Sequence, residues 1–92
     1  GDAGQRARAV LAIGQLKLRA RYAVLRQALS DPDTAVAANA AYALGLTRDT
    51  LAVPVLQRAV DSAGVATAAE AAWALGEIGE PARGVTELSL VS

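Results

Sequence analysis

The side chains that most often do chemistry in proteins are scarce in this sequence. It contains no histidine and no cysteine, which removes the usual general base, the commonest metal ligand and every thiolate nucleophile. Serine and threonine hydroxyls are present, but Lys17 is the only substitute base for them. The sequence therefore predicts that the protein is not an enzyme and has no catalytic residue, no cofactor and no metal site.

Two pairs of carboxylates remain as candidates for catalysis or metal binding. Asp31 and Asp33 stand on either side of a proline, and Glu77 and Glu80 come just before another proline. The first pair lacks the glutamate and the polar ligands that complete a calcium loop, and the second has no nucleophile nearby. Because aspartate is strongly preferred at helix N-caps, we expect the first pair to cap a helix and the second to lie in a solvated turn.

These side chains belong to a sequence that repeats every 31 residues. Ile-Gly or Leu-Gly pairs end at Gly14, Gly45 and Gly76, and residues 35–45 match residues 66–76 at eight of eleven positions. One aligned position carries the larger side chains Leu11, Tyr42 and Trp73. The period predicts a single domain, residues 1–92, of three repeats at approximately 4–31, 32–62 and 63–92.

Each repeat has the composition of a helical hairpin. Alanine fills 23 of the 92 positions and leucine another 12, and apolar residues do not alternate with polar ones at a period of two. The sequence therefore predicts an all-α fold, an α-α superhelix or solenoid of three hairpins with six helices. We expect first helices at about residues 4–16, 34–47 and 65–78, and second helices at about 18–30, 51–61 and 81–91. Asp33 or Thr34 would cap the middle first helix, and Glu80-Pro81 would start the last helix.

Three glycines recur just before each first helix ends, where a missing side chain lets a neighbouring helix approach. We expect this role for Gly14, Gly45 and Gly76. Ala37, in contrast, is expected to face outward. Replacing Gly45 with valine should therefore cost several times more stability than the same change at Ala37.

The string from Ala40 to Gly45, its copy from Ala71 to Pro81 and the turn Ser30-Asp31-Pro32-Asp33 resemble the HEAT-like repeats named after phycobilisome lyases. The similarity covers the chain from about Arg6 to Leu90. It implies a bacterial-type α-solenoid that binds proteins as a non-catalytic scaffold. Because some relatives are bilin lyases or their partners, an accessory or catalytic subunit of a bilin-lyase-type enzyme is the alternative. A helical repeat that binds nucleic acid is a third.

The chain departs from this family pattern early in the first helices. The family usually places Val-Arg there, but only Val36 and Arg6 match, each alone, while Ala37 and Ala68 stand where other arginines would lie. Any ladder of arginines between repeats is therefore largely missing.

Two sets of side chains are candidate contacts for a protein partner. Wheel geometry from the start of the second helix turns Leu18, Leu25 and Leu29 inward, so the polar residues between them face away. The aromatic position of the first helices forms an apolar ridge, or else packs on the adjacent repeat. The candidates are Arg19, Arg26, Gln27, Gln57, Arg58, Tyr42 and Trp73.

Charge is balanced overall and uneven along the chain. Nine basic residues face nine acidic ones, but residues 1–30 hold six basic residues and one acidic, while residues 62–92 hold one basic residue and four acidic. Neutrality argues against nucleic acid and membrane partners, whereas the polarity favours an acidic protein segment or self-association through the solenoid ends. The longest uncharged run, from Ala35 to Thr47, is too short to cross a bilayer, so we expect a cytoplasmic protein.

Overall fold

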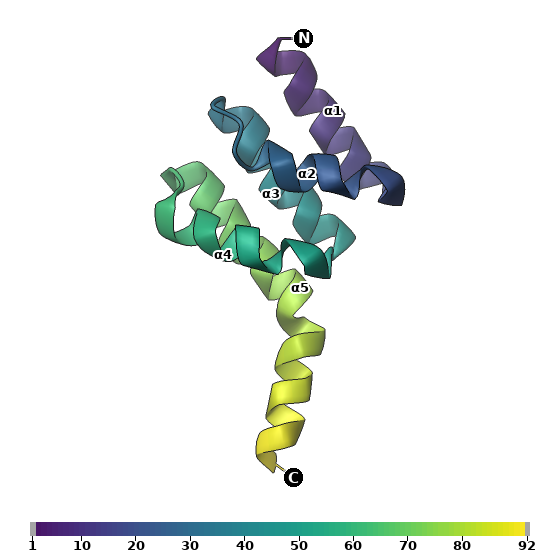
Figure 1. The fold of residues 1–92 in the computed structure, drawn as a ribbon, viewed down its shortest axis with the longest axis vertical. Helices are drawn as coiled ribbons and strands as arrows, with labels where there is room; N and C mark the ends of the chain where they lie inside the picture. Colours follow the sequence, from purple (N-terminus) through teal and green to yellow (C-terminus); the bar gives the residue numbers. More distant parts are fainter. Residues whose placement is uncertain (1, 92) are drawn as a thin grey trace.

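The computed structural model describes the backbone of residues 2–91 and the side chains of residues 2–79. Its elements are helical and no strand occurs in that range. In chain order they are α1 (Ala3–Leu16), the 3₁₀ turn η1 (Arg19–Arg21), α2 (Tyr22–Ala28), α3 (Thr34–Thr47), the 3₁₀ turn η2 (Thr50–Ala52), α4 (Val53–Ser62) and α5 (Val65–Val91). Helices α1, α3 and α5 lie side by side in one layer, and α2 and α4 cover one face of that layer (Figure 1).

The ends of α1 and α3 are set by the same chemistry one period apart. The side chain of Asp2 accepts a hydrogen bond of 2.8 Å from the Gln5 amide, and that of Asp33 accepts one of 3.2 Å from the Val36 amide. The predicted N-cap at Asp33 is thus confirmed. Both helices end at a residue with a left-handed backbone, Lys17 or Arg48, each with a φ of 53°. The backbone amide of each of these two residues donates to carbonyl oxygens in the last turn of its helix. This pattern ends the helix and reverses the direction of the chain.

The second helices begin later than predicted, because a 3₁₀ turn precedes each of them. Leu18 was expected to face inward, and this is wrong: it precedes η1, with a ψ of 84°, and is 43% exposed. A helical wheel drawn from Leu18 fails because the chain is not yet α-helical there. Leu25 and Leu29 do face the core, Leu25 fully buried and Leu29 half-buried.

The expected sixth helix is also wrong, since α5 runs without interruption through residues 81–91 and leaves five α-helices in the described chain. Gly79 occupies the position equivalent to Lys17 and Arg48, but no described glycine has a positive φ. Pro81 removes one amide donor from the helix, yet reversal at this point needs a left-handed residue that the backbone does not supply. The side-chain cap expected at Glu80 lies outside the described side chains.

The core consists of a few large aliphatic side chains set among alanines. The largest fully buried ones are Leu25, Val36, Leu44, Leu56 and Ile78. Each contributes about 1.5–3 kcal/mol by leaving water. Helices α1, α3 and α5 approach closely over Ala40, Ala41, Ala43, Ala71 and Ala74, all of which are fully buried.

Two of the three repeated glycines permit a close approach between helices. A Cβ on Gly14 would lie 2.8 Å from the Cα of Ala43, and one on Gly45 would lie 2.9 Å from the Trp73 ring and 3.0 Å from the Cα of Ala74. No described atom lies within 4 Å of a Cβ built on Gly76, so the expectation fails there, where no further helix packs on α5. Ala37 was expected to face outward, which is wrong: it is only 6% exposed, because α3 turns this position toward the turn before α5.

Candidate functional site

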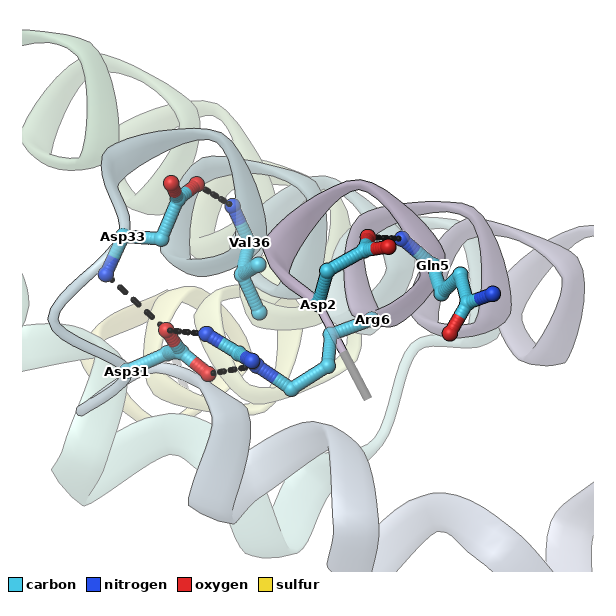
Figure 2. Close-up of polar contacts among 6 residues, drawn as sticks. All are labelled: Asp2, Gln5, Arg6, Asp31, Asp33 and Val36. Atoms are coloured by element: carbon cyan, nitrogen blue, oxygen red, sulfur yellow. Dashed lines mark hydrogen bonds and ion pairs between the residues drawn. The ribbon is translucent and has the colours of Figure 1, made fainter.

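The carboxylate pair of the first inter-repeat turn is engaged in hydrogen bonds with α1 and within the turn that starts α3 (Figure 2). Arg6 binds Asp31 with both ends of its guanidinium group, Nε to Oδ2 at 2.9 Å and Nη2 to Oδ1 at 3.1 Å. The amide of Asp33 donates to Oδ1 of Asp31 at 2.9 Å. The hydrogen bond from Arg6 and then the one from this amide hold the pKa of Asp31 below its usual range. Asp31 is therefore kept ionised as a structural anchor for α1.

A second ion pair involves Arg26, one of the residues predicted to bind a partner. Arg26 was expected to point away from the helices, but its Nη1 donates to Oδ2 of Asp49 at 2.5 Å, and its side chain is only 26% exposed. The other carboxylate oxygen of Asp49 accepts from the Leu51 amide at 3.1 Å and caps η2. The expectation fails because α2 starts at Tyr22 and places Arg26 opposite the turn that follows α3. Sequence reasoning missed Asp49, although an aspartate before Thr50 at a helix start is a recognisable cap signal.

The two aromatic candidates form a single contact between α3 and α5. Tyr42 and Trp73 stack with ring centroids 5.1 Å apart and planes inclined by 21°. The Trp73 ring also covers Gly45. Tyr42 is half-buried by this packing, whereas Trp73 stays 40% exposed. The two rings thus pack on each other between adjacent repeats. Part of the Trp73 side chain still faces solvent.

The polar candidates on the second helices are exposed. Gln27 lies on α2, and Gln57 and Arg58 lie on α4. None of these three side chains has a hydrogen bond or ion pair with another described residue. Beside Arg58, a hollow of about 510 Å³ lies between α4 and the turn that follows α2, lined by Leu29, Ser30, Val55, Arg58, Ala59, Ser62 and Ala63.

Arg19 lies apart from these residues, in the turn before α2. It lines another hollow, of about 460 Å³, between the turns that follow α1 and α3. The seven candidates therefore occupy three separate surfaces: the α2 and α4 face, the aromatic pair and the turn hollow. The structure does not bring them into one site.

Among the residues whose side chains are described, no three histidine, cysteine, aspartate or glutamate residues come close enough to hold a metal ion. Nor does any helix, within the same part of the chain, combine the length and apolarity needed to span a bilayer.

Comparison with known proteins identifies one family. A family model of HEAT repeats matches residues 2–70 and, in a second alignment, residues 22–88. Together the two alignments extend over nearly the whole chain. No individual curated protein and no solved structure matches it.

Proposed function

The chain belongs to the HEAT repeat family, and from that premise we propose that it is a non-catalytic module that binds other proteins and serves as a scaffold. Membership of the HEAT repeat family suggests a role in protein interaction but names no partner. The geometry adds support, because Asp31 and Asp49, two carboxylates at the helix turns, are engaged in structural ion pairs.

One observation carries the proposal: the second helices present uncommitted polar side chains, and one of them, Arg58, lines a hollow. Gln27, Gln57 and Arg58 are exposed on neighbouring helices of one layer, and long polar side chains of this kind can form hydrogen bonds with a partner backbone without first breaking internal bonds. The hollow of about 510 Å³ next to Arg58 gives a partner side chain room between α4 and the turn that follows α2.

We also keep as proposals the finer features that the resemblance implies. These are a phycobilisome-lyase type of repeat, continuation of the stack as an α-α superhelix, a bacterial cytoplasmic setting, an acidic protein segment as partner and self-association through the ends of the stack. None of the described side chains specifically favours the alternative of a bilin-lyase subunit.

The proposal is tested by immobilising the folded chain and identifying retained proteins by mass spectrometry, with photo-crosslinking to locate the contact. A matched variant carries Gln27→Ala, Gln57→Ala and Arg58→Ala, which leave the core untouched. We expect saturable retention by the native chain and crosslinks on α2 and α4 that the variant loses. Absence of any saturable protein ligand would contradict the proposed function.

A further inference from the structure

The two long edges of the molecule carry opposite charge. Turns that join a first helix to its second helix lie together on the right of Figure 1, and turns that lead into the next first helix lie together on the left. The turns on the right carry the exposed basic side chains of Lys17, Arg19, Arg21 and Arg48, and Asp49 there is buried against Arg26. On the left lie Asp31 and Asp33 in the turn before α3 and Asp61 near the end of α4, and Asp31 is paired with Arg6. The separation has a local cause, since Asp33 caps α3, which begins at a left-hand turn. From the order of charges in the sequence alone, the basic and acidic ends would be expected at opposite ends of the stack of repeats. In the structure the two signs lie on opposite sides of the stack instead.

The basic edge also gathers exposed leucines. Leu16 is 68% exposed, Leu18 43% and Leu51 71%, and they are the only exposed leucines among the side chains that the structure describes. A single exposed leucine is ordinary on a protein surface, but apolar side chains that gather at one place mark interaction sites. We call the six residues Leu16, Lys17, Leu18, Arg19, Arg48 and Leu51 the leucine–arginine edge.

A concave feature lies at the centre of this edge. The hollow of about 460 Å³ between the two turns has Arg19 and Tyr22 on one side and Arg48 and Leu51 on the other. The ion pair between Arg26 and Asp49 also lines the hollow and is neutral as a unit.

The cations on either side of the hollow are available to a ligand. Arg19 has no ion pair with any described residue. Arg48 comes no closer than 4.0 Å to Glu77, and both side chains of that pair are well exposed. A contact of that kind contributes little, about 0–1 kcal/mol, so a better carboxylate partner can replace it.

Resting on the proposed function, we propose that the leucine–arginine edge is a docking site for an acidic, leucine-bearing segment of a partner protein. Carboxylates of the segment pair with Arg19 and Arg48, which can bind them through two parallel hydrogen bonds each. An apolar side chain of the segment enters the hollow against Leu51 and Tyr22. The concave shape favours a peptide over a lipid surface, because a flat bilayer would touch the rim and leave the hollow unfilled.

The site is tested by selecting binders from a phage-displayed library of random 12-residue peptides on the immobilised chain. Enriched peptides are then synthesised, and their Kd is measured by fluorescence anisotropy. Two matched pairs of variants separate this edge from general effects. Arg19→Glu is compared with Arg8→Glu, an equal change of charge at another exposed arginine. Leu51→Ser is compared with Val65→Ser, a change at an even more exposed apolar residue on the opposite edge.

We expect enriched peptides that combine aspartate or glutamate with leucine. Their Kd should rise about tenfold in Arg19→Glu and in Leu51→Ser, equivalent to about 1.4 kcal/mol, and stay within twofold in the two controls. The loss in Arg19→Glu should appear mainly as slower association, and added salt should reproduce it.

Three results would overturn the inference. Peptides whose binding depends on Gln57 and Arg58 but not on Arg19 would move the site to α2 and α4 and leave the proposed function intact. Failure to enrich any peptide would count against both. Binding to vesicles of phosphatidylcholine with anionic phosphatidylserine, together with no peptide binding, would assign the edge to a membrane.

Discussion

The interface between the first and second repeats, around α1 and α3, and the interface between the second and third, around α3 and α5, use equivalent positions of the repeat but different chemistry. The first is polar at its margins: Arg6 binds Asp31, Arg26 binds Asp49, and Asn39 donates to the carbonyl of Ala7 at 3.1 Å. The second relies on the Tyr42 and Trp73 stack and on small residues beneath it, with one loose, exposed pair of charges.

Both members of the Arg6 and Asp31 pair are absent one period later. One period after Arg6 stands Ala37, and one period after Asp31 stands Ser62. Removing only one member would have left a charge without its partner, which costs more than losing both. Ala37 is buried, so at this position the second interface has apolar packing where the first has an ion pair.

The largest expected effect comes from the glycines, and it differs between the interfaces. Gly14→Ala forces a Cβ against the backbone of Ala43, which cannot move without shifting α3, so we expect a loss of about 1–3 kcal/mol. Gly45→Ala should cost less, because the exposed Trp73 ring can move aside in part. Gly76→Ala serves as the control and should gain about 0.5–1 kcal/mol from helix propensity. Urea unfolding measures all three, and equal losses at Gly14 and Gly76 would show that the packing is wrong.

Next in size is the buried ion pair of the first interface. Asp49→Ala leaves Arg26 without its partner and η2 without its cap, and we expect a loss of about 2 kcal/mol. Asp61→Ala is the matched control, because Asp61 is exposed and has no partner among the described residues, and it should change stability by less than about 0.5 kcal/mol. Thermal unfolding followed by circular dichroism compares the two variants. A small loss of stability in Asp49→Ala would show that the Arg26–Asp49 pair does not stabilise the fold.

The aromatic stack should give a somewhat smaller effect in the second interface. Trp73→Leu and Tyr42→Leu, taken singly and together, should reveal a coupling of about 0.5–1.5 kcal/mol beyond the loss of buried area. The coupling should not change with salt, since no charge is involved. Strictly additive losses would mean that the rings are neighbours without stabilising each other.

The smallest effect is the pH dependence of the turn that holds α1. The folded pKa of Asp31 is lowered by Arg6, so the stabilisation is complete above the ordinary aspartate value of about 3.9 and is lost as the pH falls through the lowered folded value. In Arg6→Gln, the pKa of Asp31 measured by NMR should rise toward the ordinary value, and the stability of the chain should fall less steeply in acid. An unchanged pKa would show that the ion pair does not form in solution.

Sequence reasoning succeeded where a local pattern fixes the structure and failed where packing decides it. The 31-residue period, the aspartate cap at Asp33 and the close approaches at Gly14 and Gly45 depend on residues within one turn or on an exact repeat. Leu18 and Arg26 were misplaced because the 3₁₀ turn η1 delays the start of α2. The inward position of Arg26 also depends on its ion pair with Asp49, which lies in the next repeat. The leucine–arginine edge joins residues about 30 positions apart, and only the stacking of two turns reveals it.

Native-state hydrogen exchange most directly tests the claim that the two interfaces are built differently and act separately. Stacked repeats behave as nearly independent neighbours, so Asp49→Ala should speed the exchange of α1 and α2 amides more than that of α5 between residues 65 and 78. Trp73→Leu should do the reverse. Uniform acceleration along the chain in both variants would show a single cooperative unit and contradict the account.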